Sequence, residues 1–390
     1  MRIVNIRQHT FALPSAQANA SISFQSMTAS AVAIVTDVRR DGRLIVGYGL
    51  DSAGRFGHGA LAMERFAPRL MTALPERLVD PDGRNFDPDK IWSVMMQDEK
   101  PGGHGERAGA VGLLDMAIWD IVAKIEDKPL WRVLAERDGR DTDTLPRKVA
   151  TYATGGYYRA ADDASALREE LRSIRDRGHT HVKIKAGGAL LADDCRRIEA
   201  AIGAFGSADR VAIDLNGTLD LARADTFLSA VDGYGLRWVE EVGDPLDYDL
   251  QADIGRRYRT PFAMGENTFS LPDATNLIRY GGVRRDRDLL QFDVSLSYGL
   301  VEYRRILTML GANGYARQQS FPHAGHVLSL HAVGGFGLGS HETGADPEGL
   351  FNGYPDGCVV EGGYVNLPDA PGLGIETTPN LYARVRSLAS

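Results

Sequence analysis

Two lysines stand one residue apart in the short apolar segment "HVKIKAG", which covers residues 181–187. Side chains two residues apart on a strand point to the same face, so Lys183 and Lys185 are expected to lie side by side near the end of one strand. Each ammonium group disfavours the charge of the other, and partial burial adds to that effect. The pair therefore predicts that the pKa of Lys185 is lowered toward about 7–8, where a lysine can act as a general base.

Three acidic residues follow the next predicted strands at equal intervals. Asp214, Glu240 and Glu266 are spaced 26 residues apart, which places one carboxylate at the same point of three successive strand–helix units. Any one of these acids alone could equally be a helix cap or part of a surface ion pair. Three converging carboxylates, however, repel one another unless a cation lies between them, and Mg²⁺ prefers such oxygen ligands. The spacing therefore predicts a Mg²⁺ site.

The later predicted strands add Asp293 in "QFDVS", His323 in "SFPHAG" and Glu342 in "GSHE". A histidine alone is as often structural as functional. An aspartate on one strand and a histidine on the next can form a hydrogen-bonded pair that orients the ring. Lys185 and His323 would then face the two sides of a bound substrate across a barrel mouth. A metal between them would stabilise the enediolate that forms when an α-proton is removed.

The elements that must position these side chains alternate between short apolar strands and helices from about residue 148 onward. Each gap between the first seven strands holds one plausible helix. Eight such strands favour an α/β fold, a (β/α)₈-type barrel with functional groups at the C-terminal strand ends. A doubly wound open sheet stays the alternative, although no glycine-rich phosphate loop follows a strand. The predicted strands are "KVATYAT", "THVKIKAG", "RVAIDLNG", "LRWVEEV", "TPFAMGEN", "LLQFDVS", "YARQQSFPH" and "GFGLGSHE".

The part of the chain before the barrel has a different pattern. Antiparallel strands are predicted over the first 50 residues and helices over residues 59–145. We therefore expect an α+β domain over residues 1–145, the barrel over 146–365, and a C-terminal segment, 366–390, that returns to the first domain or closes over the barrel. Flexible loops are predicted at the small, polar "PSAQANASISFQSMTAS" and at the glycine-rich "GLDSAGRFGHG".

Composition excludes several function classes. The 390 residues carry a net charge of -8, so the basic footprint of a nucleic-acid-binding protein is missing. No segment reaches the roughly 18 apolar residues of a membrane span, and the N-terminus lacks the apolar core of a signal peptide. Cys195 and Cys358 do not have a metal-binding spacing. A cytoplasmic protein is expected, with neither a nucleic-acid nor a membrane partner.

Taken together, these residues resemble the enolase superfamily, within its mandelate racemase subgroup. The resemblance covers nearly the whole chain and implies the (β/α)₈ barrel with residues 1–145 as an N-terminal capping domain. The loops of this cap near residues 15–30 and 50–60 would then choose the substrate. One departure is "EEVGDP" in place of the more usual Glu-Glu-Pro, and the ligand there stays Glu240. The matching positions are Lys183-Ile-Lys185, Asp214-Leu-Asn216, Glu240-Glu241, Gly265-Glu266-Asn267, Asp293, His323 and Glu342.

The resemblance also implies a role for each of these side chains. Asp214, Glu240 and Glu266 would bind Mg²⁺. Lys185 would be one acid/base group, and His323, paired with Asp293, the other. The remaining implied roles are contacts with the substrate carboxylate or other substrate oxygens, assigned to Lys183 (which also assists Lys185), Asn216 and Glu342.

Within the subgroup, the chain most resembles the D-tartrate dehydratases. This implies that Lys185 removes the proton α to the metal-bound carboxylate, that His323 protonates the departing β-hydroxyl, and that the enol product ketonises to oxaloacetate. A dicarboxylate substrate also requires a cationic group from the cap, for which Lys100 in "QDEKPGGHGERAG" is predicted to bind the second carboxylate. Other cap candidates are His104, Arg107, Arg55 and His58.

Several alternatives stay open. A longer aldonate or aldarate could be dehydrated by the same residues, or a substrate without a β-leaving group could be racemised. A non-catalytic barrel is disfavoured because each of the expected metal ligands is present. A lactonising or dipeptide-epimerising activity is disfavoured because the sixth strand carries Asp293 where those relatives carry a lysine. The resemblance further implies a homo-oligomer.

Overall fold

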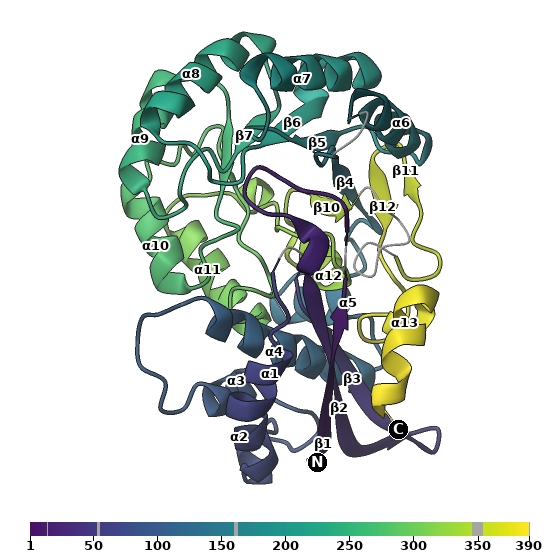
Figure 1. The fold of residues 1–390 in the computed structure, drawn as a ribbon. Helices are drawn as coiled ribbons and strands as arrows, with labels where there is room; N and C mark the ends of the chain where they lie inside the picture. Colours follow the sequence, from purple (N-terminus) through teal and green to yellow (C-terminus); the bar gives the residue numbers. More distant parts are fainter. Residues whose placement is uncertain (14, 53–54, 160–162, 345–353, 390) are drawn as a thin grey trace.

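The computed structural model describes residues 1–13, 15–52, 55–159, 163–344 and 354–389. Its centre is a ring of parallel strands that pair in chain order, and the last strand of the ring pairs back with the first (Figure 1). This closure confirms the predicted barrel and excludes the open sheet. The strands are β4 (Lys148–Gly155), β5 (Val182–Lys185), β6 (Val211–Asp214), β7 (Trp238–Glu240), β8 (Phe262–Met264), β9 (Leu289–Leu290) and β10 (His341–Gly344).

The seventh position of the ring differs from the prediction. The segment "YARQQSFPH" forms a 3₁₀ turn over Arg317–Gln319, and only Ser320 bridges to Leu290 of β9. Gly339 donates its N–H to the Ser320 carbonyl at 2.9 Å and so continues the ring. Pro322 follows closely and has no N–H to extend a ladder. The eighth predicted strand is also shorter, because helix α12 occupies its beginning.

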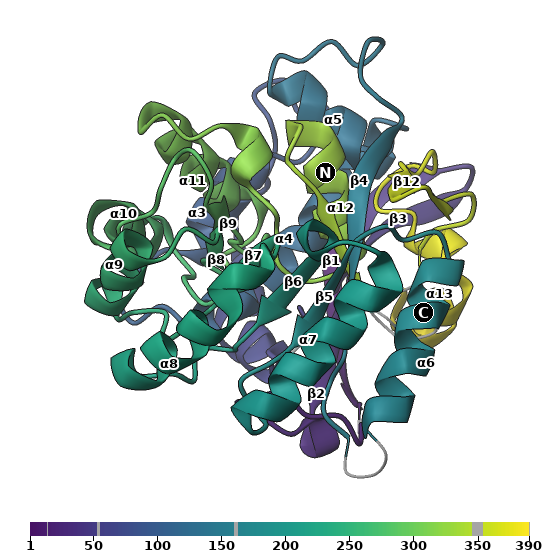
Figure 2. The ribbon, with the colours of Figure 1, turned by 90° about the horizontal axis from the view of Figure 1, so that it is seen from above.

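Helices cover the outside of the ring, as Figure 2 shows from above. Among the described residues, each gap between neighbouring strands from β4 to β9 contains one α-helix, as predicted. Two of these helices begin at an aspartate whose carboxylate accepts a backbone N–H of the first turn, Asp220 and Asp247. The helices are α6 (Asp163–Asp176), α7 (Leu191–Phe205), α8 (Leu221–Val231), α9 (Tyr248–Arg257), α10 (Leu271–Tyr280), α11 (Leu300–Ala312) and α12 (Val327–Phe336).

The strand register aligns the polar side chains. Lys185 pairs with Asp214, and Asp214 pairs with Glu240. The intervening apolar residues, such as Ile184 and Ile213, are fully buried and belong to the opposite strand face. The alternation therefore puts the apolar side chains toward the helices and the row of charged side chains inside the ring.

The N-terminal domain places a three-stranded antiparallel sheet against a buried helix. Its strands are β1 (Ile3–Ala12), β2 (Thr28–Arg40) and β3 (Arg43–Leu50). A Cβ on Gly49 would lie 2.1 Å from the carbonyl oxygen of Leu113, so this close packing of β3 on α4 requires glycine. The helices are α1 (Gly59–Leu61), a π-helical turn over Ala62–Phe66, α2 (Ala67–Thr72), α3 (Pro88–Met95), α4 (Glu106–Ile125) and α5 (Leu130–Arg137).

The end of the chain contacts both parts. The hairpin of β11 (Val360–Glu361) and β12 (Tyr364–Asn366) pairs with β4 of the ring. Helix α13 (Pro379–Val385) then packs on the N-terminal sheet, where the rings of Tyr382 and Tyr48 lie 6.2 Å apart. Figure 1 shows this helix beside β3.

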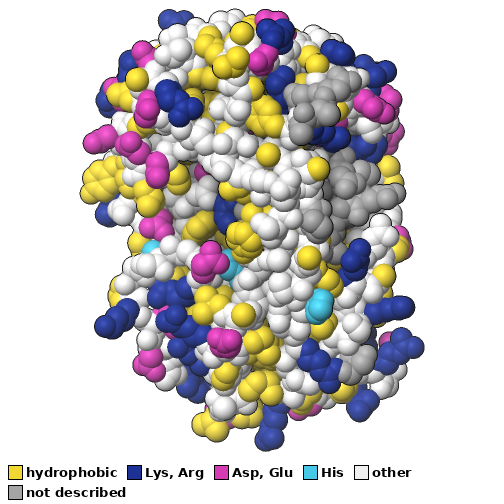
Figure 3. Space-filling view, in the orientation of Figure 1, with side chains coloured by type: hydrophobic (Ala, Val, Ile, Leu, Met, Phe, Trp, Pro, Cys, Tyr) yellow, Lys and Arg dark blue, Asp and Glu magenta, His cyan; other side chains and the backbone are white. Residues whose placement is uncertain are grey.

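Acidic and basic side chains are interspersed over the face seen in Figure 3. Among the described residues, no helix combines the length and the apolarity that crossing a membrane requires.

Candidate active site

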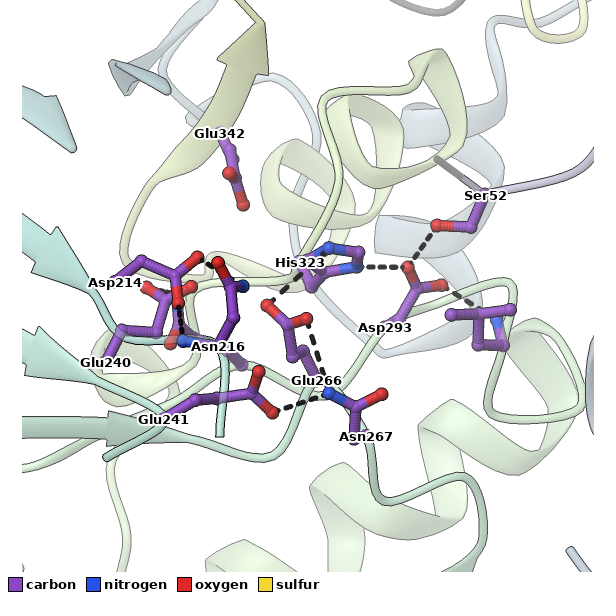
Figure 4. Close-up of polar contacts among 12 residues, drawn as sticks. Ser52, Asp214, Asn216, Glu240, Glu241, Glu266, Asn267, Asp293, His323 and Glu342 are labelled. Atoms are coloured by element: carbon purple, nitrogen blue, oxygen red, sulfur yellow. Dashed lines mark hydrogen bonds and ion pairs between the residues drawn. The ribbon is translucent and has the colours of Figure 1, made fainter. Parts of the chain in front are cut away.

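Three carboxylates meet at the C-terminal ends of β6, β7 and β8 (Figure 4). Asp214 and Glu240 are the last residues of their strands, and Glu266 follows β8 after Gly265, whose φ of 118° turns the chain. One oxygen atom from each acid lies within 4.8 Å of the others, and all three residues are buried. A buried cluster of hard oxygen donors fits a divalent cation such as Mg²⁺.

The electrostatics of the triad also fit a cation. Burial raises the pKa of Glu240 to about 8, although the neighbouring Lys183 acts in the opposite direction. At Asp214, burial works toward a higher pKa, but the ammonium groups of Lys185 and Lys183 outweigh it and lower the pKa. Gathering these acids is therefore costly unless positive charge is close to them, and a bound divalent ion supplies such charge.

Lys185 contacts the triad directly. Its Nζ atom lies 2.5 Å from Oδ2 of Asp214 and 5.2 Å from the centre of the Tyr157 ring. Burial works to lower the pKa of Lys185, but the Asp214 carboxylate outweighs burial and raises it. The predicted lowering toward 7–8 is thus wrong for this set of charges, because an acid touches the ammonium group. A cation on Asp214 would compete for the same oxygen and would shift the pKa of Lys185 back down.

Lys183 lies deeper than Lys185. It forms an ion pair with Glu240 and another with Oε1 of Glu342, the latter at 3.0 Å. Glu342 also accepts a hydrogen bond from the Tyr152 hydroxyl at 3.3 Å. Lys183 and Glu342 are buried and are not among the residues that line the neighbouring cavity. Their direct contact with substrate stays a prediction.

His323 and Asp293 form the predicted pair. Nδ1 of His323 lies 2.8 Å from Oδ2 of Asp293, and Nε2 lies 3.6 Å from Oε2 of Glu266. The backbone N–H groups of Ser295 and Leu296 each donate to Oδ1 of Asp293 at 2.7 Å. Burial alone would lower the pKa of His323, but Glu266 and Asp293 raise it to about 9. The two carboxylates therefore favour the protonated form of the ring, in which the Nδ1–H is donated to Asp293.

A cavity of about 370 Å³ lies over these groups. The loop between β1 and β2 extends over the centre of the ring in Figure 1, and the Ser21 hydroxyl of this loop donates to the Asn216 carbonyl at 2.8 Å. Both predicted cap loops contribute to the cavity wall. The lining residues are Asn19, Ser21, Ile22, Phe24, Met27, Arg55, Phe56 and Glu106 from the cap, and Tyr157, Lys185, Asn216, Glu241, Glu266, Asn267 and His323 from the barrel.

The structure does not bring Lys100 to this cavity. Its side chain is exposed and is not part of the lining. Arg107 donates to the carbonyl groups of Lys100 and Gly102, and Gly102 and Gly103 have positive φ angles of 80° and 62°. Glu106, further along the same segment, lines the cavity, whereas the turn at residues 100–103 lies outside the lining, so Lys100 does not hold the predicted place.

Of the other cap cations, Arg55 lines the cavity. Its guanidinium donates to Oδ1 of Asn267 and lies 3.9 Å from Oε1 of Glu266. His58 is buried, with Nδ1 2.9 Å from Oδ1 of Asp51. His104 and Arg107 contact the Tyr298 hydroxyl at 3.0 and 2.8 Å instead.

Sequence reasoning assigned no role to three barrel residues of the wall, although Glu241 and Asn267 stand in the matching motifs. Tyr157 follows β4 and lies against Lys185. Asn267 donates to Oε1 of Glu241 at 2.6 Å, and Glu241 has a φ of 41°. The left-handed backbone conformation turns the second glutamate of the "EE" pair toward the cavity while Glu240 points into the triad. The Glu240-Glu241 doublet, at the end of a strand, was the signal for Glu241.

Comparison with known proteins places this geometry in a family. Residues 166–381, more than half of the chain, match the family described as enolase C-terminal domain-like. The chain is 26% identical over 370 residues to the L-talarate/galactarate dehydratase of Salmonella typhimurium, covering 93% of this chain and 85% of that protein. It is also 26% identical over 290 residues to the arabinonate dehydratase of Saccharolobus solfataricus, covering 73% and 74%.

Solved structures share the fold along the whole chain. A racemase from Streptomyces coelicolor A3(2) with bound magnesium covers 99% of both chains at 22% identity, with a TM-score of 0.76. An L-talarate dehydratase from Polaromonas sp. JS666, complexed with Mg and L-glucarate, covers 98% of this chain and 96% of that one at 22% identity, with a TM-score of 0.74. With its family match spanning β5 to β10 and all three triad acids, the chain belongs to the enolase superfamily.

Proposed function

We propose that the protein is a Mg²⁺-dependent dehydratase of acid sugars. The observation that carries this proposal is the position of Lys185 and His323, which line one cavity next to the buried triad Asp214, Glu240 and Glu266. When bound, Mg²⁺ would hold a substrate carboxylate and neutralise the charge that builds up on it as the α-proton leaves. Two acid/base groups from well-separated positions of the barrel then serve the two proton transfers of an elimination, removal of the α-proton and protonation of the leaving hydroxyl.

Lys185 takes the proton from the carbon α to the carboxylate. Its Nζ atom is close enough to Asp214 to be oriented by that acid at 2.5 Å, and the ring of Tyr157 borders it at 5.2 Å. The amine must be neutral to accept a proton, so positive charge close to Asp214 is a requirement of this step.

His323 donates a proton to the departing β-hydroxyl. Oδ2 of Asp293 lies 2.8 Å from Nδ1 of His323 and holds the proton on that nitrogen. Nε2 is therefore the atom that gives up its proton to the substrate. The C–O bond breaks, water leaves, and the electron pair from the broken C–H bond forms the carbon–carbon double bond of an enol. The enol then ketonises in water to a 2-keto acid.

The named relatives support a polyhydroxy acid as the substrate class, since they include dehydratases of arabinonate and of talarate/galactarate. Within this class we propose D-tartrate, which would yield oxaloacetate. Arg55 supports a dicarboxylate, because it brings a guanidinium from the cap to the cavity. The second candidate is a longer aldonate or aldarate. The cavity volume of about 370 Å³ favours it, with apolar cap residues such as Ile22 and Phe24 in the wall.

The test is a screen for keto-acid formation from a library of acid sugars that includes all tartrate stereoisomers, with Mg²⁺ and with EDTA. We expect Mg²⁺-dependent turnover of at least one acid, with D-tartrate among the substrates. Turnover of five- or six-carbon acids with inert D-tartrate would move the proposal to the second candidate. Racemisation without loss of water, or no turnover of any acid, would contradict the dehydratase assignment.

A further inference from the structure

Ser52 connects the capping domain to the His323–Asp293 pair. It stands two residues after β3, in the cap, and its hydroxyl lies 2.5 Å from Oδ2 of Asp293, 241 residues further along the chain. Ser52 and Asp293 are 1% and 0% exposed. Figure 4 shows the Ser52 hydroxyl pointing at Asp293 from the side opposite the triad.

The direction of this hydrogen bond follows from the other partners of Asp293. An ionised carboxylate has only acceptor atoms, so the Ser52 hydroxyl donates. Oδ1 accepts the backbone N–H groups of Ser295 and Leu296, whereas Oδ2 accepts from Ser52 and from Nδ1 of His323. The barrel backbone therefore fixes one oxygen, and the cap serine shares the other with the histidine.

Ser52 is itself held in place by its neighbour. The carboxylate of Asp51 accepts the backbone N–H of Ser30 at 2.5 Å and that of His58 at 3.1 Å. The Asp51 N–H donates to the Ser30 carbonyl at 3.0 Å. The backbone and the carboxylate of Asp51 are thus hydrogen-bonded to β2 and to the start of α1. The chain at Ser52 therefore has little freedom to move away from Asp293.

The same cap segment also borders the cavity. Arg55 and Phe56 are in its lining, three and four residues after Ser52. A single segment of the cap thus contacts both the space for substrate and the carboxylate that orients the catalytic histidine.

We propose that Ser52 is a positioning residue for His323. Its hydroxyl keeps Oδ2 of Asp293 aligned with the imidazole of His323, which lines the cavity. The kinetic part of this inference rests on the proposed function, whereas the hydrogen-bonding part does not.

Kinetics of matched variants test the inference. Ser52→Ala is expected to lower kcat about 10- to 100-fold, the usual range for loss of a partner that orients a functional side chain, with KM changed less than about threefold because the substrate contacts remain. Ser52→Thr keeps a hydroxyl and should restore most of kcat. Ser30→Ala is the control, because Ser30 is equally buried and its hydroxyl contacts Thr10 and the Gly59 N–H instead.

A second readout does not require a substrate. In protein with ¹⁵N-labelled histidine, the Nδ1 proton of His323 should give a resonance protected from solvent exchange. Among the nine histidines this resonance is identified by its loss in His323→Asn. We expect it to remain in wild type and Ser30→Ala, and to broaden or exchange faster in Ser52→Ala.

Two outcomes would overturn the inference. One is a Ser52→Ala protein with unchanged kcat and an unchanged resonance. The other is an equal loss of kcat in Ser52→Ala and Ser30→Ala, which would show general weakening of the cap. If wild type dehydrates none of the acids tested, the proposed function fails, and the resonance alone decides the role of Ser52.

Discussion

Replacing Lys185 by methionine separates the two roles of its ammonium group. The change removes the proposed base but keeps an unbranched apolar stem of similar length. It also removes the cation 2.5 Å from the buried Asp214 carboxylate. Asp214 then keeps two donors from Asn216, the backbone N–H at 2.9 Å and the side-chain amide at 3.0 Å.

The two effects have different sizes and different dependence on metal. Loss of a general base lowers the rate about 10²- to 10⁴-fold, which is about 3–5 kcal/mol of activation free energy. Removing one partner of a buried ion pair lowers the free energy of unfolding by about 3–5 kcal/mol, and the Asn216 donors favour the lower end. Lys185 competes with Mg²⁺ for Asp214, so the variant should bind Mg²⁺ at least as tightly as wild type. Mg²⁺ at about 100 times its Kd then raises the free energy of unfolding by about 2.7 kcal/mol.

Keto-acid formation, calorimetric titration with Mg²⁺ and urea unfolding with and without Mg²⁺ measure these quantities. Asp214→Asn is the matched comparison, since it should lose both turnover and Mg²⁺ binding. Lys185→Met with turnover within tenfold of wild type would refute the role of Lys185 as base. A loss of Mg²⁺ affinity as large as in Asp214→Asn would refute the competition for Asp214.

The other predictions concern three further side chains. His323→Asn should lower the rate of dehydration about 10²- to 10⁴-fold, while Lys185 still exchanges the substrate α-hydrogen with deuterium from the solvent. If NMR finds no deuterium in the recovered substrate, the division of roles between Lys185 and His323 is contradicted. Arg55→Met should raise KM for a dicarboxylate more than for a monocarboxylate of equal length, and equal changes would remove Arg55 from substrate recognition. Burial lowers the pKa of His331 from 6.5 to about 4, so its stabilising contribution is complete above pH 6.5 and decreases as pH falls toward 4. The loss is about 2–3 kcal/mol by pH 4.5, and urea unfolding of His331→Gln should show a weaker pH dependence; an identical dependence would contradict the assignment.

The polar residues at the strand ends could be predicted because they depend on local pattern. Alternation within a strand decides which face a side chain occupies, and equal spacing puts Asp214, Glu240 and Glu266 at equivalent points of successive units. The pairing of Asp293 with His323 follows from the same rule for neighbouring positions of the ring, even though only Ser320 bridges the segment before His323 to β9. None of these placements required knowledge of how distant parts of the chain pack.

The misses depend on packing between distant segments. Ser52 lies in a different domain from Asp293, and no periodicity connects the two. Lys100 was chosen for its charge, but the conformation of its loop is decided by Arg107 and two glycines with positive φ. His326, to which sequence reasoning gave no chemical role, caps α12, and its Nε2 lies 3.9 Å from Oδ1 of Asp293.

The prediction that the pKa of Lys185 is lowered was wrong for a related reason. The prediction weighed the neighbouring lysine in the same strand, whereas the Asp214 carboxylate of the next strand contacts the ammonium group directly. Two strands had to be paired in register before the stronger of the two charges could be identified.

A crystal grown with Mn²⁺ in place of Mg²⁺ tests the metal site directly, because the anomalous signal of manganese locates the ion independently of the protein density. We expect one strong peak in contact with oxygen atoms of Asp214, Glu240 and Glu266, with Lys185 and His323 on either side of the open coordination positions. An anomalous peak elsewhere, or none at these three acids under saturating Mn²⁺, would contradict the magnesium site and the reaction built on it.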